Sequence, residues 1–195
     1  MPTVTALRDD RRGRVAVELD GSPWRVLPVH VVARTGIAEG RVLDRPALRE
    51  LRRELRRAEG LAVATRALRA RDLSRRRLAE RLERAAVTPA AAAESLETLE
   101  RAGLLDDARV ARGRAHALAG RGYGDVAIRH RLATEGLQEA DVAEAIAELA
   151  PEPERARLLV ERRGHGPRTA RYLAGRGFGE EAVELALGAA FGQED

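Results

Sequence analysis

Two adjacent carboxylates, Asp106 and Asp107, are the first candidates for chemistry in this chain of 195 residues. They lie in the stretch GLLDDARVAR (103–112), and paired acids can hold a divalent metal ion or act as general acid and base. A metal site needs further ligands, and the histidines show no paired spacing such as i, i+4 on one helix. The histidines are His30, His116, His130 and His165. No metal site is therefore predicted, although a metal-dependent nuclease that uses the two aspartates stays an open alternative.

The same pair of aspartates also fits a structural role at the start of a helix. The helical segment ARVARGRAHALA (108–119) follows them directly. A carboxylate at this place accepts hydrogen bonds from the free amides of the first turn and lies favourably at the positive end of the helix dipole. We therefore predict that one aspartate caps this helix, that Leu104 and Leu105 pack back onto the preceding segment, and that the pair is architectural.

The composition favours a soluble, helical protein without a cofactor. Hydrophobic residues make up 44% of the chain, charged residues 34% and aromatic residues 3%, and a core of alanine and leucine favours closely packed helices. There is no cysteine, which excludes disulfides and thiolate metal sites. No apolar run approaches the roughly 20 residues of a membrane span, and no G-x-x-x-x-G-K-[ST] loop is present, so neither a membrane protein nor an ATPase is expected. The N-terminus lacks a signal-peptide segment, and the expected location is the cytoplasm.

Positive charge is concentrated in the first half of the chain. All 35 basic residues are arginine, and the formal net charge is +4. Residues 1–103 hold 22 arginines against 15 acidic residues, whereas residues 104–195 hold 13 against 16. Arginine in place of lysine is typical of GC-rich coding, so the distribution says more than the number. This asymmetry suits a polyanion or an acidic protein partner.

The first 60 residues are predicted to form a β-hairpin segment and a linking helix. The stretch GRVAVELDGSPWRVLP (13–28) alternates apolar and polar residues on both sides of an Asp-Gly turn, which is typical of a hairpin. Residues 3–7 are expected to add a strand, and residues 28–34 a short helix. From Pro46 to Gly60 the leucines lie on one face, which predicts an amphipathic helix that ends at the glycine.

The rest of the chain repeats. Leu82, Leu132 and Leu173 are equivalent positions, and with offsets of 50 and then 41 residues the neighbouring apolar positions align without gaps. Each copy divides into three helical stretches and is too small to be very stable alone, so the copies are expected to pack on their neighbours. The predicted fold is mainly α, with tandem three-helix repeats in an elongated curved array and a small N-terminal β-hairpin-containing segment. The predicted repeats span residues 61–103, 104–150 and 151–195.

Local signals mark the ends of the helices in each copy. Ser74 is a good N-cap for the second helix of the first copy, and Pro89 suits the first position of the third helix. In the later copies Gly136 and Gly177 can adopt the left-handed conformation that closes a helix. The first copy has Ala86 at this position and departs from the pattern.

Three stretches of the helical part have a distinctive order and spacing. They are ALRARDLSRRRLAERL (67–82), the junction GLLDDARVAR (103–112) and YGDVAIRHRLATEGL (123–137). Together they resemble the RecX family, the regulators of the bacterial RecA recombinase, which carries an S-R-x-E-L type helix, a G-[LY]-[LI]-[DN]-D-x-x-[FV]-A-R junction and then I-x-x-x-L-x-x-[KR]-G. This chain has Arg77 where glutamate is common and Val110 where phenylalanine is usual. The resemblance spans roughly residues 61–190.

The resemblance to RecX implies a regulator and not an enzyme. Members of the family bind along the groove of the RecA–DNA filament and suppress ATP hydrolysis, strand exchange and the coprotease function that triggers the SOS response. The implied partners are the RecA filament and single-stranded DNA, with double-stranded DNA as a further candidate, in DNA repair and homologous recombination. We expect a monomer. The alternative is a helical-repeat DNA-binding or architectural protein without a recombinase partner, which would bind DNA with steep salt dependence and leave RecA unchanged.

Arginines are the candidate contact residues for RecA or DNA, because guanidinium groups form bidentate contacts with carboxylates and phosphates. The densest stretch, residues 66–84, contains Arg66, Arg69, Arg71, Arg75, Arg76, Arg77, Arg81 and Arg84. The later copies add Arg121, Arg129, Arg131, Arg162, Arg163, Arg168 and Arg171. The alternative is that these side chains only solvate helix faces or pair with glutamates at helical spacing, as Arg76 and Glu80 would.

Overall fold

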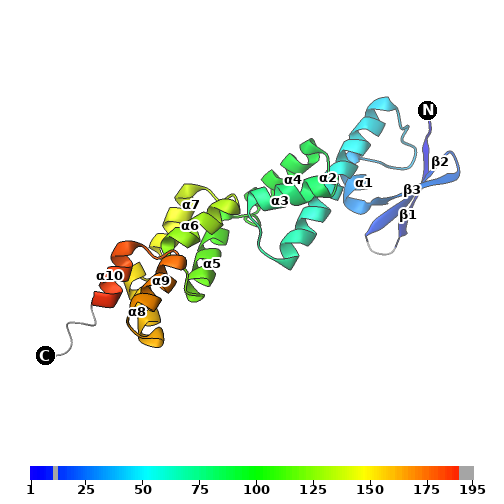
Figure 1. Cartoon of the computed structure of the whole chain (residues 1–195). Coiled ribbons are helices and arrows are strands. Elements are labelled where there is room, and N and C mark those ends of the chain that lie inside the picture. The colour runs from blue at the N-terminus through cyan, green and yellow to red at the C-terminus, as the bar shows by residue number, and fades with distance from the viewer. Residues whose placement is uncertain (11–12, 189–195) are drawn as a thin grey trace. The chain divides into compact units, whose positions relative to one another are not determined.

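The computed structural model describes residues 1–10 and 13–188, which form ten helices and one three-stranded sheet (Figure 1). The strands are β1 (Val4–Asp10), β2 (Arg14–Leu19) and β3 (Ser22–Pro28). The helices are α1 (Val29–Thr35), α2 (Arg45–Ala70), α3 (Arg75–Arg84), α4 (Pro89–Arg101), α5 (Asp107–Gly120), α6 (Asp125–Thr134), α7 (Glu139–Ala147), α8 (Glu152–Arg163), α9 (Pro167–Gly175) and α10 (Glu180–Gly188). The predicted mainly helical fold with a small N-terminal sheet is confirmed.

The chain divides into two compact units whose sequences interleave. Of the described residues, the first unit contains 1–10, 13–67 and 81–98, and the second contains 68–80 and 99–188. The helices α2, α3 and α4 therefore each contribute residues to both units. The division by sequence repeats stays a prediction, and the end of its third repeat, residues 189–195, lies outside the described residues.

An antiparallel sheet forms one side of the core of the first unit. β1 pairs with β2 and β2 with β3, and the turn between β2 and β3 lies at Asp20 and Gly21, whose φ angles are 50° and 79°. A type I′ turn requires positive φ at both central residues, which explains the Asp-Gly pair. Val15 and Val17 of β2 belong to one buried cluster with Leu51 of α2, as the alternation in the sequence predicts. The sheet thus buries one face and anchors the start of α2.

Helix α2 continues past the residue where its end is predicted. Gly60 is expected to close the helix, but α2 runs to Ala70, so this prediction is wrong. A Cβ atom at Gly60 would lie 2.7 Å from the hydroxyl oxygen of Ser95 and 3.2 Å from the carbonyl oxygen of Ala91, both in α4. The glycine therefore permits a close approach of α4 to α2, and the sequence alone does not distinguish this use from a helix end.

Helices α3, α6 and α9 end in the same way. The carbonyl of a fully buried leucine accepts a hydrogen bond from the amide five residues later, at N···O distances of 3.1, 3.4 and 3.2 Å in chain order. These leucines are Leu82, Leu132 and Leu173. The residue before the donor has a positive φ, 57° at Ala86 and 79° at both Gly136 and Gly177. The Cβ atom of an alanine strains the left-handed conformation. The end of α3 therefore has the same backbone shape as the ends of α6 and α9, but at a cost in free energy.

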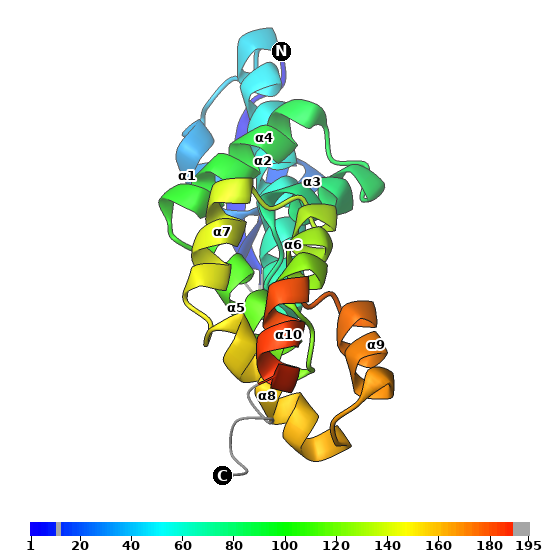
Figure 2. The same cartoon turned by 60° about the vertical axis from the view of Figure 1, so that its left-hand side comes forward.

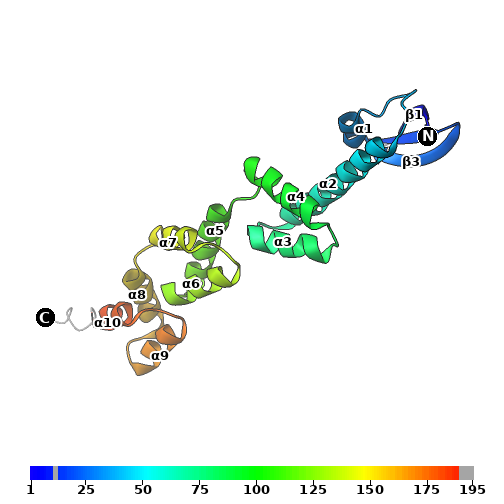
Figure 3. The same cartoon turned by 90° about the horizontal axis from the view of Figure 1, so that it is seen from above.

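Two hydrophobic clusters organise the described part of the second unit. Helices α5, α6 and α7 surround one cluster, which contains the fully buried Ala111, Ile128 and Val142. Helices α8, α9 and α10 surround the other, which contains the fully buried Val160 and Leu173. Each group of three helices can be followed in Figures 2 and 3. Small and branched side chains make up most of both clusters, and Phe178 is the aromatic member of the second, so cores poor in aromatic residues still close.

The two groups of three helices are joined at the start of α6. The amide of Gly124 donates a hydrogen bond to the carbonyl oxygen of Arg176 at 3.0 Å. A Cβ atom at Gly124 would overlap the backbone of Gly177, so the position needs glycine. Glu152, the first residue of α8, accepts a hydrogen bond from the amide of Asp125, the first residue of α6, at 2.6 Å. Backbone groups and one carboxylate therefore fix the junction.

Candidate contact surfaces

The aspartate pair at the start of α5 forms helix-capping hydrogen bonds. Asp106 is the N-cap of α5, and its Oδ1 accepts a hydrogen bond from the amide of Arg109 at 2.9 Å. Oδ1 of Asp107 accepts one from the amide of Arg75, the first residue of α3, at 2.7 Å. Glu152 of α8 makes the same kind of bond to the first residue of α6. An acid at the start of one group of three helices thus caps a helix of the preceding group in both cases.

Burial raises the pKa of the Asp107 carboxyl above the ordinary value of an aspartate. The amide hydrogen bond from Arg75 lowers this pKa, the charges of Asp141 and Glu100 raise it, and the guanidinium of Arg75 lowers it. Desolvation is the largest of these influences and sets the direction. Among the residues with described positions, no group of three or more histidine and acidic side chains is arranged to hold a metal ion. The geometry at Asp107 is that of a junction between helices.

Three consecutive arginines at the start of α3 are engaged by carboxylates of the second unit. Nε of Arg75 lies 2.7 Å from a carboxylate oxygen of Glu100. Arg76 and Arg77 both approach Glu80, with N···O distances of 3.5 and 3.0 Å. The i, i+4 pair of Arg76 and Glu80 is therefore present in the folded chain.

Two of these arginines also cover the C-terminal end of α6. Arg76 and Arg77 both donate to the carbonyl oxygen of Thr134, Arg77 at 3.3 Å. The side chain of Arg76 packs against Gly136 just beyond the helix. Cations at a helix C-terminus satisfy free carbonyl groups and interact favourably with the dipole. Charge reversal at these arginines would therefore disturb the packing of α6 as well as the surface charge.

The other arginines of the 66–84 stretch fall into two groups. A groove of about 330 Å³ in the first unit is lined by Arg66, Arg81 and Arg84. Arg66 and Arg81 form no ion pair with a described residue. In the second unit, Arg71 lines a groove of about 250 Å³, and Arg69 is exposed. The densest basic stretch of the sequence is thus shared between the two units.

Several arginines of the second unit lie over tyrosine rings. The guanidinium carbon of Arg131 is 4.3 Å from the centroid of Tyr123, and that of Arg163 is 3.7 Å from the centroid of Tyr172. Arg176 lies over both rings, at 4.5 Å from Tyr123 and 5.3 Å from Tyr172. Such cation–π contacts hold the guanidinium groups against the protein itself.

The remaining predicted contact residues are exposed on the helices of the second unit or, for Arg121, directly after α5. Nε of Arg129 lies 3.1 Å from a carboxylate oxygen of Glu139, and Nε of Arg171 donates to the carbonyl oxygen of Pro167 at 3.3 Å. Three further arginines are exposed and form no ion pair with a residue that the structure describes. They are Arg121, Arg162 and Arg168.

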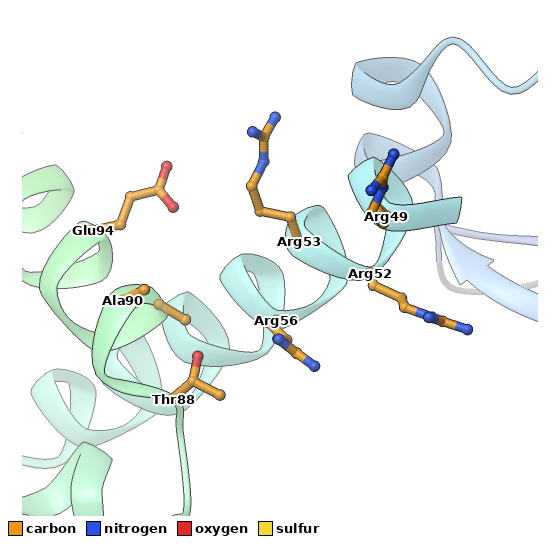
Figure 4. A pocket seen from close by; sticks show the side chains of 8 residues that line it. Arg49, Arg52, Arg53, Arg56, Thr88, Ala90 and Glu94 are labelled. Carbon is orange, nitrogen blue, oxygen red and sulfur yellow. The ribbon is translucent and has the colours of Figure 1, made fainter. Parts of the chain in front are cut away.

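A group of arginines outside the predicted contact residues lines another groove in the first unit. This groove, the α2 groove, has a volume of about 350 Å³ and lies between α2 and the start of α4 (Figure 4). Its lining consists of Arg49, Arg52, Arg53, Arg56, Thr88, Ala90, Ala91 and Glu94. The arginines follow the spacing i, i+3, i+4, i+7, which places them on one face of α2. In the sequence, this spacing indicates an arginine-lined face of α2. The density of arginine alone does not indicate the groove.

Comparison with known proteins finds relatives that are described as regulatory proteins. No family model matches the chain. The regulatory protein RecX of Deinococcus radiodurans is 33% identical over 187 residues, which cover 85% of this chain and 90% of that protein. The regulatory protein RecX of Xanthomonas oryzae pv. oryzae is 34% identical over 142 residues, which cover 68% of this chain and 85% of that protein.

Solved structures share the fold. A crystal structure of regulatory protein RecX has a TM-score of 0.82 at 19% identity and covers 95% of this chain and 98% of that chain. A crystal structure of RecX from Lactobacillus salivarius has a TM-score of 0.62 at 16% identity and covers 69% of this chain and 96% of that chain. The described helices include none that is both long and apolar enough to span a membrane. The sequence identity extends over most of this chain and of its relatives, and the chain belongs to the RecX family of regulatory proteins.

Proposed function

We propose that this protein binds the RecA–DNA filament and suppresses its ATP hydrolysis, strand exchange and coprotease activity. Membership of the RecX family supports a regulatory role, and the resemblance to that family implies RecA as the partner. The observation that carries the proposal is the groove lined by Arg66, Arg81 and Arg84. Arg66 and Arg81 form no ion pair with a described residue, so both are available to carboxylates or phosphates of a partner.

The groove at Arg66 and Arg81 suits an anionic partner surface. Its other lining residues are Val63, Ala67 and Ala85, whose short side chains leave room for a partner group between the guanidinium groups. A RecA–DNA filament offers both carboxylates and phosphates. The protein acts by occupying the filament and needs no cofactor, and it binds as a monomer to filaments on single-stranded or double-stranded DNA.

The test is the ATPase activity of RecA on single-stranded DNA as this protein is added. Wild-type protein should lower the rate, and the double variant R66E/R81E should need a roughly tenfold or higher concentration for half inhibition. This factor follows because charge-assisted hydrogen bonds contribute about 1.5–3 kcal/mol each. Strand exchange should respond in the same order.

The matched control is R8E/R157E, which makes the same change in net charge at exposed positions outside the groove. The side chains of Arg8 and Arg157 are 72% and 59% exposed. This control should inhibit like the wild type. Wild-type protein that leaves the ATPase rate unchanged would refute the action on RecA, and equal inhibition by R66E/R81E would move the contact away from this groove.

A second candidate is a DNA-binding or architectural protein that acts without a recombinase. The α2 groove favours it, because four arginines gather there beside the start of a helix. Such a protein would bind DNA with steep salt dependence and leave RecA activity unchanged. The ATPase measurement therefore separates the two functions.

A further inference from the structure

The α2 groove holds guanidinium groups that the carboxylates around it do not neutralise. Glu54 of α2 is 8% exposed and lies 2.9 Å from Arg34. Glu94, on the rim of the groove, lies 2.7 Å from Arg57. Glu54 and Glu94 are thus both engaged by arginines outside the lining of the groove.

Three of the four groove arginines form no ion pair within the part of the chain that the structure describes. Glu50 reaches Arg53 only at 4.0 Å. Arg49, Arg52 and Arg56 are exposed and form no ion pair with any residue in the described ranges. Like charges gathered on one face repel one another, and a bound anion relieves that repulsion. The groove therefore suits a ligand that carries several negative charges.

The arrangement of the arginines fits charges that follow one another along a chain. Residues 49 and 56 are separated along the helix axis by about 10 Å, and the i, i+4 pairs by about 6 Å. Arg52 and Arg56 extend to one side of α2, and Arg49 and Arg53 extend to another (Figure 4). A single small anion cannot meet all four groups at these separations, whereas successive phosphates of a nucleic acid strand can.

The start of α4 adds neutral donors on the same groove. Thr88 and Ala90 line the groove at the point where α4 begins, and the first turn of α4 has no acidic residue. Free amides at a helix N-terminus favour phosphate oxygens, which also accept hydrogen bonds from guanidinium groups. No aromatic side chain is among the lining residues, so the groove offers no surface on which bases could stack.

We propose that the α2 groove binds the backbone phosphates of single-stranded DNA without reading its bases. The arginines form two adjacent rows on one face of α2. A flexible single strand can follow these rows, whereas a stiff duplex brings each of its strands alongside the helix over a shorter length. The contact is independent of the proposed action on RecA, because each measurement that tests it is made without RecA. It also assigns a role to residues 49–56 that the predicted repeats leave outside.

The experiment measures the fluorescence anisotropy of a labelled oligo-dT strand with full-length protein over a range of salt concentrations. The triple variant R49Q/R52Q/R56Q should bind roughly tenfold or more weakly near 0.1 M salt. The slope of log affinity against log salt should fall in magnitude by about 2, since each phosphate contact on a single strand contributes about 0.7. A strand of mixed sequence should give the same affinity as oligo-dT.

Two further variants make the test specific to the groove. The variant R8Q/R25Q/R157Q removes the same charge at exposed positions elsewhere and should bind the strand like the wild type. The variant E94Q removes the negative charge from the rim of the groove. It should bind the strand more tightly than the wild type, whereas R49Q/R52Q/R56Q should bind it more weakly. All variants should keep the helical circular dichroism of the wild type. Arg49, Arg52 and Arg56 form no ion pair in the described chain, and the ion pairs that the other variants remove lie at the surface, where such pairs contribute little.

Three results would overturn this assignment. The first is a folded R49Q/R52Q/R56Q protein that binds oligo-dT with unchanged affinity and unchanged salt slope. The second is a loss confined to a labelled duplex, which would make the groove a double-strand contact. The third is a loss of binding to labelled poly-glutamate with no change for oligo-dT, which would make it a contact for an acidic protein.

Discussion

Two arginine-rich stretches of this protein differ in how their guanidinium groups are paired. Arg75, Arg76 and Arg77 are held by carboxylates and by the end of α6. In the α2 groove, by contrast, Arg49 and Arg56 form no ion pair with a residue in the described chain. The availability of an arginine to a partner therefore depends on which acids and helix ends lie opposite it in the folded chain. The local density of basic residues does not reveal this.

The position of each stretch in its helix explains the difference. Arg75 to Arg77 occupy the first turn of α3, where the helix dipole disfavours positive charge. The fold compensates with Asp107 at the first amide and with Glu80 and Glu100 at the side chains. The arginines of the α2 groove lie inside a helix of 26 residues, where no end effect demands a partner. They stay available to a ligand for this reason.

The largest change in stability should come from removing the three charges at the start of α3, and removing three charges of the α2 groove is the comparison. The variant R75Q/R76Q/R77Q should lower the free energy of unfolding by about 1–3 kcal/mol, because it removes ion pairs and the bonds to Thr134. The variant R49Q/R52Q/R56Q should change it by less than about 0.5 kcal/mol, as expected for surface positions without partners. Urea unfolding followed by circular dichroism measures both. Equal destabilisation by the two variants would abolish the distinction between held and available arginines.

The sequence predicts the parts of the fold that depend on local chemistry. The Asp-Gly turn of the hairpin and the positive φ angles at Gly136 and Gly177 follow from residue types that tolerate these conformations. Gly60 is the counterexample, because its role depends on the distance to Ser95 of α4. The sequence shows the same residue type whether a glycine ends a helix or allows a neighbouring helix to approach. Only the tertiary contact distinguishes the two roles.

The second effect concerns Asp107, the acid that compensates the arginine-rich start of α3. Asp107→Ala should lower the free energy of unfolding by about 0.5–2 kcal/mol, because the amide of Arg75 loses its acceptor. Asp107→Asn keeps an oxygen acceptor and should cost less. Asp106→Asn should also cost little, because it keeps the cap of α5. The measurement is again chemical unfolding, and a folded Asp106→Ala/Asp107→Ala protein that loses activity together with a bound metal would contradict the structural role of the pair.

The third effect tests α3 at its other end, away from the arginines. Ala86→Gly should raise the free energy of unfolding by about 1 kcal/mol, because φ is 57° there and glycine adopts this region without strain. Thermal unfolding measures the change. Gly136→Ala, at the equivalent helix end of α6, is the matched variant and should destabilise, since φ there is 79° and the space is filled by Arg76. A loss of stability in Ala86→Gly would mean that the methyl group packs more favourably than its backbone angle costs.

The candidate contact residues are less predictable than the fold for a specific physical reason. Capping by an aspartate before α5 is a local event, and the expected cap falls to Asp106. The bond from the Arg75 amide to Asp107 spans 32 residues, and the contact of Arg76 with Thr134 spans 58. Such contacts exist only when one group of helices packs on the next. Charge patterns read along the sequence therefore overestimate how many arginines face a partner.

The smallest expected effect is the pH dependence that Asp107 contributes. Burial raises the pKa of this carboxyl in the folded protein, so the folded state binds a proton more readily than the unfolded chain. Its contribution to stability is therefore fully present below the ordinary aspartate pKa of about 3.9 and is lost as the pH rises through the folded pKa. The free energy of unfolding of the wild type, taken relative to Asp107→Asn, should rise as the pH falls from neutral towards 4. Urea unfolding of both proteins over this range measures the difference. A fall instead of a rise would show that the amide and guanidinium of Arg75 outweigh desolvation, and that the compensation at the start of α3 is mainly electrostatic.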